Sequence, residues 1–445
     1  AHMGHARTYL IFDTLVRYLR SRGWRVEYLQ NITDVDDKII DRARRESTTP
    51  LALARRFERR YLADMRALGV RSVDRYARAS DFVREIVAQI TVLRSKGYAY
   101  RAKDGYYFDV ARFKGYGRLS RRTVAQAEDA VSRIDAGVAK RNRGDFALWK
   151  FPKRPPETRR APRPYARTVT EDGEPAWCTP LGWGRPGWHI EDTAITETCF
   201  GPQYDVHGGA EDLKFPHHEA EIAQEEAASG KHPLVKVWMH AGFLRVDGQK
   251  MAKSLGNFTT IRRFLEEHPP ALLRWIVLSH HYRSPINYSQ TLVDQARSSL
   301  ATLEEFLAKL DLVARARRRF PPLGIAARLA AAEREFHRAM GDDLNTPFAL
   351  AHLFALGLDY QQKIWTMPSS EAKALRRYVA SILKMLGVAV GSTAVPPRVE
   401  RLVARRELCR GRKQFAQADS LRARLRRLGY TVEDTPAGPF VRPAS

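Results

Sequence analysis

Two short motifs in the chain carry side chains that suit a polyphosphate ligand. Residues 2–5 read HMGH at the expected start of a helix, where unpaired N–H groups and the helix dipole favour an anion. His2 and His5 are three residues apart, so their rings share one helical face, and Gly4 lets a ligand approach the backbone. Two incidental surface histidines are the alternative interpretation of so short a pattern.

The second motif is KMAKS at residues 250–254. The ammonium groups of Lys250 and Lys253 and the hydroxyl of Ser254, on a short loop, suit a cluster that closes over a triphosphate. Such a cluster stabilises the charge that develops on a departing pyrophosphate. A solvated lysine-rich turn is the alternative interpretation of this motif alone.

A third group of residues suits metal binding. The chain reads GWHIED at 187–192, DVHGG at 205–209 and FPHHEAE at 215–221. His217 and Glu221 are four residues apart directly after Pro216, so an imidazole and a carboxylate share one face at the start of a helix. This pair supplies half of a metal site. Without further context, an ordinary His–Glu pair on a helix is the competing interpretation.

In their order and separation, the HMGH and KMAKS motifs resemble the two signature motifs of class I aminoacyl-tRNA synthetases. The motif WHIEDTA, which begins at Trp188, resembles the archaeal-type variant of cysteinyl-tRNA synthetases, and the segments KQFAQAD and EDTP near the carboxyl end resemble that family's anticodon-binding end. Other segments similar to that family are residues 31–38 (NITDVDDK), 145–150 (DFALWK), 281–285 (HYRSP) and 342–347 (DDLNTP). The resemblance covers essentially the whole chain.

The resemblance implies a cysteine–tRNA ligase that uses ATP with Mg²⁺ to form cysteinyl adenylate and then transfers cysteine to the 3′ end of tRNA(Cys). It assigns phosphate stabilisation in catalysis to His2, His5, Lys250 and Lys253. It implies contacts to cysteine from Thr33, Trp188 and His217. The ATP-binding residues that it implies are His2, Gly4, His5, Asp205, His207, Gly208, Gly209, Lys250, Lys253 and Ser254.

The resemblance also implies a Zn²⁺ ion that binds the thiolate of the substrate. The family's usual ligands are two cysteines, a histidine and a glutamate; His217 and Glu221 match the last two, and Asp192 stands at the second cysteine position. The first ligand, and a first strand of the nucleotide-binding unit, are expected upstream of residue 1. A set of N and O ligands is harder than usual for zinc. Cys199 as a displaced ligand is the alternative.

Composition agrees with a nucleic-acid partner. The 75 Lys and Arg exceed the 50 Asp and Glu by 25, which favours a polyanion, either RNA or an anionic membrane. The chain has no apolar run of about 18 residues, so no transmembrane helix is expected. Its three widely spaced cysteines fit a reducing cytoplasm rather than a disulfide framework. We expect a monomer.

The surrounding patterns predict an α/β fold: a class I, Rossmann-like core with a parallel sheet, then a helical bundle and a small basic anticodon-binding domain. Ile11, Leu15 and Leu19 predict a helix ending at Gly23, with a strand at 26–32. The last helix is expected to present Phe415, Ala418, Leu421, Leu425 and Leu428 on one face. The predicted domains are 1–290, with an exposed Pro/Arg-rich loop near 151–175, then 291–390 and 398–445.

Two other functions remain possible from the sequence alone. A related ligase that joins cysteine to an amino sugar in mycothiol synthesis has the same adenylation core, but it needs no anticodon domain, and the basic tail argues against it. A non-catalytic RNA-binding paralogue is favoured by Asp192 and by the expected missing strand. The retained His2, His5, Lys250, Lys253, His217 and Glu221 argue against it.

Overall fold

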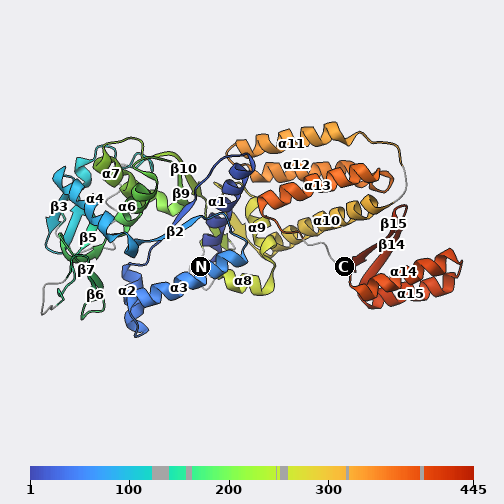
Figure 1. The fold of residues 1–445 in the computed structure, drawn as a ribbon, viewed down its shortest axis with the longest axis horizontal. Coiled ribbons are helices and arrows are strands. Elements are labelled where there is room, and N and C mark those ends of the chain that lie inside the picture. Colours follow the sequence, from blue (N-terminus) through green and yellow to red (C-terminus); the bar gives the residue numbers. More distant parts are fainter. Residues whose placement is uncertain are drawn as a thin grey trace. The chain divides into compact units, whose positions relative to one another are not determined.

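The computed structural model describes residues 1–122, 140–156, 163–246, 248–250, 259–316, 320–390 and 395–444. The chain forms two compact units, each built from two separate stretches of sequence (Figure 1). Unit 1 comprises Ala1–Thr8 and Glu27–Phe243, and unit 2 comprises Tyr9–Val26 and Leu244–Ser445. Among the described helices, none combines the length and the apolar character needed to cross a membrane.

The first predicted helix and strand are both present. Helix α1 (Met3–Ser21) is followed by Gly23, whose φ of 83° is the left-handed value that glycine adopts after a helix end. The strand is shorter than predicted, because β1 spans only Leu29–Ile32 and pairs in parallel with β2 (Arg75–Arg78). Between these strands lie α2 (Asp37–Arg45), whose first turn is capped by Asp36, and α3 (Pro50–Ala67), capped by Thr49.

The main core of unit 1 lies between an antiparallel sheet and three helices. The six strands follow the order β3-β4-β5-β8-β7-β6. On one face, alternate residues such as Tyr106 and Phe108 pack with α4 (Val83–Ser95), α6 (Trp188–Phe200) and α7 (Glu219–Ser229). The strands are β3 (Ala99–Ala102), β4 (Gly105–Phe108), β5 (Phe146–Lys150), β6 (Arg167–Val169), β7 (Pro175–Thr179) and β8 (Gly182–Pro186).

The Pro/Arg-rich stretch near 151–175 contains one short strand among its described residues. Residues 157–162 lie outside the described residues, while Arg167–Val169 form β6, which pairs with β7. The stretch therefore contributes an edge strand to the sheet.

A second parallel pair in unit 1 carries site residues. Strand β9 (Tyr204–Ala210) pairs in parallel with β10 (Val235–Ala241), and α7 is the connection between them. Such a β-α-β crossover is the repeating unit of nucleotide-binding α/β folds. These parallel pairs and their helical connections confirm the α/β prediction.

Unit 2 is mainly helical. After the small sheet and helices that follow Phe243, four long helices form a bundle in which α10 packs on α13 and α11 on α12 (Figure 1). The small sheet consists of β11 (Leu244–Val246), β12 (Gln249–Lys250) and β13 (Ile286–Tyr288). The helices are α8 (Ile261–Glu267), α9 (Pro270–Leu278), α10 (Gln290–Arg315), α11 (Ile325–Gly341), α12 (Thr346–Gln361) and α13 (Ser369–Leu386).

A helical hairpin and a β-hairpin complete unit 2. They are α14 (Pro397–Gly411), α15 (Phe415–Arg427), β14 (Tyr430–Thr435) and β15 (Gly438–Pro443). The predicted apolar face of α15 is mostly correct, since Ala418 and Leu425 are buried and Leu421 and Leu428 pack on the small core. Phe415 is the exception: it is the first residue of the helix and is 61% exposed.

Candidate active site

Helices α6 and α7 bring the three predicted metal ligands together. Asp192 lies in the second turn of α6, His217 lies two residues before α7, and Glu221 lies in the first turn of α7. The Nε2 atom of His217 is 2.7 Å from Oδ2 of Asp192 and 2.9 Å from Oε1 of Glu221. All three side chains are buried. Residues separated by 25 positions in sequence thus form one cluster.

This cluster fits a divalent cation. The two oxygens of Glu221 are buried and have no hydrogen-bond partner among the described residues. One Nε2 atom carries at most one hydrogen, so it cannot donate to both carboxylates that approach it. One ligand atom from each residue lies within 4.8 Å of the other two. An N/O donor set of this kind suits zinc and also harder divalent metals.

The pKa values of the three residues are shifted by burial and by one another's charges. Burial lowers the pKa of His217, but the carboxylates of Glu221 and Asp192 overcome this and raise it to about 10. Burial raises the pKa of Asp192, whereas the surrounding histidines, led by His207 and His217, hold the pKa of Glu221 below its usual range. The site therefore favours a positive charge among its carboxylates.

Neighbouring side chains orient the cluster. Asn31, at the end of β1, donates from Nδ2 to Oδ1 of Asp192, and Nδ1 of His217 lies 2.8 Å from Nδ1 of His189. Metal-ligating side chains are commonly fixed by such outer partners. Neither Asn31 nor His189 was predicted, because each contact joins elements far apart in sequence. The motifs NITD and GWHIED were the available signals, since both residues lie within them.

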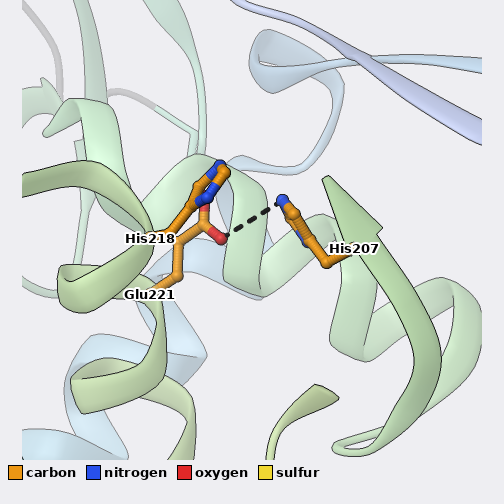
Figure 2. A group of neighbouring side chains, drawn as sticks. All are labelled: His207, His218 and Glu221. Atoms are coloured by element: carbon orange, nitrogen blue, oxygen red, sulfur yellow. Dashed lines mark ion pairs between the residues drawn. The ribbon is translucent and has the colours of Figure 1, made fainter. Parts of the chain in front are cut away.

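Glu221 also belongs to a second group of possible ligands, with His207 and His218. Its carboxylate points toward His207, whose Nε2 is 3.4 Å from Oε2, and His218 lies beside it (Figure 2). His218 in turn contacts His240, with 2.8 Å between Nδ1 and Nε2. The sequence interpretation missed His218 and His240, although the doubled histidine at 217–218 was a visible signal.

Trp188 covers one side of the predicted site. Its ring stacks on that of His217, with 4.2 Å between centroids and 21° between planes, and the residue is 38% exposed. One face of the indole thus contacts a predicted ligand while part of the ring reaches solvent. Thr33 is half-buried directly after β1, two residues beyond Asn31.

At the start of α1, His2 and His5 stack on one another with 3.6 Å between ring centroids. The backbone N–H of His5 donates to Nδ1 of His2 over 3.3 Å, so His2 satisfies one of the unpaired donors of the helix end. A Cβ on Gly4 would lie 2.9 Å from the His2 ring, so glycine permits this arrangement. Desolvation, His2 and the chain's amino group lower the pKa of His5 to about 4.

Some residues of β9 lie beside the metal cluster, and others lie at the surface. Asp205 is exposed and pairs with Lys236, with 2.9 Å between Oδ1 and Nζ, so the structure does not bring it to the metal cluster. His207 contacts Glu221 instead. A Cβ at Gly209 would lie 2.7 Å from Leu213 and 3.2 Å from His218, so the close packing here favours glycine. Gly208 lies between His207 and Gly209 on β9.

The predicted lysine loop is largely beyond the described residues. Lys250 ends β12, and its backbone pairs with Arg245 of β11. Residues 251–258 lie outside the described part of the chain, so Lys253 and Ser254 have no observed position. Cys199, the alternative ligand, belongs to neither metal-binding group found among the described residues; its Sγ accepts from Arg75 over 3.3 Å.

Three family models match the chain. Residues 1–298 match the class I (C) catalytic domain of tRNA synthetases, residues 335–391 match the DALR domain, and residues 392–442 match the cysteinyl-tRNA ligase anticodon binding domain. The third match lies in the region where the sequence predicted a basic RNA-binding domain.

Curated relatives extend over nearly the whole chain. A cysteine–tRNA ligase of Thermococcus gammatolerans is 39% identical over 98% of this chain and 90% of the relative. One of Halorhodospira halophila is 42% identical over 98% of this chain and 91% of the relative.

Solved structures agree on the fold. The methionyl-tRNA synthetase of Mycobacterium tuberculosis in complex with methionyl-adenylate superposes with a TM-score of 0.61 at 18% identity, over 87% of this chain and 88% of the other. The LeuRS–tRNA–LeuAMS complex of Agrobacterium radiobacter K84 gives a TM-score of 0.62 at 12% identity, over 87% and 82% of the two chains. At such identities the likeness shows the fold alone.

Proposed function

Because the chain belongs to the cysteinyl-tRNA ligase family and attaches cysteine to tRNA(Cys), we propose that Asp192, His217 and Glu221 hold the metal ion that recognises the cysteine side chain. The observation that carries this proposal is the buried carboxylate of Glu221, which has no hydrogen-bond partner among the described residues. The nitrogens nearest to its oxygens are those of His217, at 2.9 Å, and His207, at 3.4 Å, and a divalent cation would bind the carboxylate together with such imidazole nitrogens.

The reaction has two steps. The carboxylate of cysteine attacks the α-phosphate of ATP, which forms cysteinyl adenylate and releases pyrophosphate. The terminal ribose hydroxyl of tRNA then attacks the activated carbonyl and releases AMP. No covalent enzyme intermediate is required, so the protein acts mainly by positioning the reactants and stabilising charge.

The proposed metal is Zn²⁺. When bound, it would supply a centre that prefers a thiolate to a hydroxyl, which separates cysteine from serine better than pocket shape does. Asp192 and Glu221 would provide oxygen ligands, and His217 a nitrogen. Asn31 would hold Asp192, while His207 would hold the second oxygen of Glu221. Trp188 would wall the pocket through its stack on His217.

The ATP phosphates are assigned to the start of α1 and to the lysine loop. His2, Gly4 and His5 offer ring and backbone donors at a helix amino terminus, which suits phosphate oxygens. Lys250 and Lys253 would neutralise the departing pyrophosphate together with Mg²⁺, and the hydroxyl of Ser254 would donate a hydrogen bond to it. The remaining predicted contacts are Thr33 to cysteine and Asp205, His207, Gly208 and Gly209 to the adenylate, and they stay predictions.

The larger-scale expectations are proposals as well. We propose a catalytic domain over 1–290, a helical bundle over 291–390 and an anticodon-binding domain over 398–445. A cytoplasmic, monomeric enzyme stays a prediction. The amino-sugar ligase and the non-catalytic paralogue are not favoured, since residues 392–442 match an anticodon-binding domain and the relatives are cysteine–tRNA ligases.

The test of the metal site is the variant Glu221→Ala. We expect it to lose bound metal and to raise the KM for cysteine in ATP–pyrophosphate exchange by more than about tenfold, because one of three ligands is removed. Metal content is measured by elemental analysis of the purified protein.

The matched control is Glu211→Ala, which removes a half-buried carboxylate paired with Lys214. It should keep the metal and the parental KM. Unchanged zinc content and unchanged cysteine affinity in Glu221→Ala would exclude the assigned site. Charging of tRNA by the parent protein, with serine rejected, tests the overall activity separately.

A further inference from the structure

A second group of possible metal ligands lies beside the assigned site in unit 1. It consists of His207 on β9 and of His218 and Glu221 at the start of α7 (Figure 2). His218 and Glu221 are three residues apart, so they share one face of the first helical turn. One ligand atom from each of the three residues lies within 4.8 Å of the other two. The group thus adds two imidazoles to a carboxylate that the assigned site already uses.

The spacing of His207 and Glu221 is that of two ligands of one ion. The Nε2 atom of His207 is 3.4 Å from Oε2 of Glu221, which is long for an N–H···O hydrogen bond. Two ligands that lie about 2.0–2.1 Å from a tetrahedral zinc ion are about 3.4 Å apart. The contacts of His217 with Asp192 and Glu221, at 2.7 and 2.9 Å, are shorter than this separation. An ion therefore fits between His207 and Glu221 without a change in their separation.

The two oxygens of Glu221 face different imidazoles. Oε1 lies 2.9 Å from Nε2 of His217, whereas Oε2 lies 3.4 Å from Nε2 of His207. A carboxylate with this arrangement can bridge two metal ions, and two-metal sites hold their ions about 3.5–4 Å apart. The negative charges of Glu221 and Asp192 reduce the repulsion between two such ions. Glu221 can therefore serve both groups at once, with one ion on each oxygen.

One nitrogen of each histidine in the second group is held by a neighbouring side chain. Nδ1 of His207 lies 2.6 Å from the hydroxyl oxygen of Tyr204, and Nδ1 of His218 lies 2.8 Å from Nε2 of His240. In the tautomer in which Nδ1 carries the hydrogen, each ring donates to this neighbour and keeps the lone pair of Nε2 for a metal. Metal-ligating histidines commonly donate their second ring N–H in this way.

The surroundings of the two imidazoles leave room for an ion. A Cβ at Gly209 would lie 3.3 Å from Nε2 of His218, so glycine keeps the space beside this nitrogen open. The indole of Trp238 lies against both imidazoles, with 5.0 Å between ring centroids in each case. His218 and Glu221 are buried, whereas the side chain of His207 is 17% exposed. An ion can therefore enter from the side of His207.

We propose that His207, His218 and Glu221 form a second site for a divalent transition-metal ion such as Zn²⁺, with Glu221 as the bridge between the two sites. The bridge rests on the proposed function, because Glu221 is also a ligand there. Two histidines and one glutamate are a ligand set of catalytic zinc sites, which keep a fourth position open. This set has one more nitrogen than the set of Asp192, His217 and Glu221, so it suits zinc better than the harder magnesium ion.

The experiment counts zinc ions per chain. The full chain is dialysed against Zn²⁺, and its metal content is measured by elemental analysis. We expect two ions in the parent protein and one each in His207→Gln, His218→Gln and Asp192→Ala. In His207→Gln the affinity for the second ion should fall by more than about tenfold, because one of three ligands is removed. Since the side chain of His207 is partly exposed, this variant disturbs packing less than His218→Gln does.

The matched control is His232→Gln. His232 is exposed, and its Nδ1 lies 2.7 Å from Glu226, which belongs to α7 as Glu221 does. Neither His232 nor Glu226 belongs to a metal-binding group found among the described residues. The variant thus removes an imidazole that is paired with a glutamate of the same helix. It should keep two ions and the parental rate of ATP–pyrophosphate exchange.

The two sites fail in different ways. A single ion that His207→Gln and His218→Gln both retain would overturn the second site, and its loss in Asp192→Ala would leave the proposed function intact. An ion that Asp192→Ala retains and His207→Gln loses would support the second site and overturn the assigned first one. An equal loss of zinc in His232→Gln would mean that exposed histidines bind the additional ion, which also overturns the second site.

Discussion

At the scale of single residues, the site depends on carboxylates held where water cannot reach them. Glu221 meets this condition with histidines on two sides, His217 and His207. Glu225, one turn further along α7, is also buried but has different neighbours. It shares the side-chain amide of Gln89 with Glu197, which lies 2.8 Å from the same nitrogen. The carboxylate of Glu221 therefore suits a bound cation, whereas the carboxylate of Glu225 suits a bound proton.

Glu225→Gln is therefore expected to change how stability depends on pH. Burial, followed by the charge of Glu197, raises the pKa of Glu225 to about 8 from 4.5. Between these values the folded state holds a proton that the unfolded state has lost, so stability falls as pH rises from about 4.5 to about 8. Glutamine imitates the protonated form, so the variant should gain roughly 2–4 kcal/mol at pH 8 and little at pH 5.

Urea denaturation at the two pH values checks this expectation. Glu266→Gln, at an exposed position, is the control. Equal stability changes in both variants at both pH values would mean that Glu225 does not hold a proton in the folded chain.

The sequence predicted three candidate metal ligands that the structure brings together, but not the side chains around them. Asp192, His217 and Glu221 were predicted because their motif and the spacing of His217 and Glu221 carry the information locally. Their partners Asn31, His189 and His240 were not, because contacts between distant segments depend on how elements pack. Asp205 was expected from its motif to bind ATP, which stays a prediction; its side chain is exposed and pairs with Lys236.

At the scale of elements, periodicity predicted helices well and strands less well. The helix from Met3 to Ser21 and most of the apolar face of α15 followed from regular spacing, with Ala418 and Leu425 buried. Strand β6 was not predicted, because its surroundings are rich in proline and arginine and its partner β7 alone defines it. Strand pairing is a property of two segments, so one segment's composition does not reveal it.

A buried ion pair joins α1 to α9 within unit 2. Asp13 Oδ2 lies 2.8 Å from Arg274, and both side chains are almost fully buried. Asp13→Asn would leave a buried guanidinium without its countercharge, so we expect a loss of about 3 kcal/mol in stability. Thermal unfolding measures this loss, with Asp294→Asn, at an exposed ion pair of α10, as the control. Equal melting temperatures for the two variants would contradict the assigned role.

At the scale of the whole molecule, the net charge of +25 makes the affinity for tRNA depend on salt concentration. Binding of tRNA should weaken steeply as salt rises, since each phosphate contact releases counterions. Cysteine is small and carries no net charge, so its KM in the exchange reaction should change little over the same range. Parallel salt series for the two substrates test this, and a flat tRNA series would contradict a binding surface built on charge.

Unit 2 is assembled from both ends of the chain, because Tyr9–Val26 belong with Leu244–Ser445. On the ribosome, Asp13 therefore emerges long before Arg274 or the carbonyl of Leu386 that Arg274 contacts. At usual rates of synthesis this delay is on the order of tens of seconds. During that interval the apolar face of α1 has no partner from unit 2, so this nascent helix is open to chaperones and to aggregation.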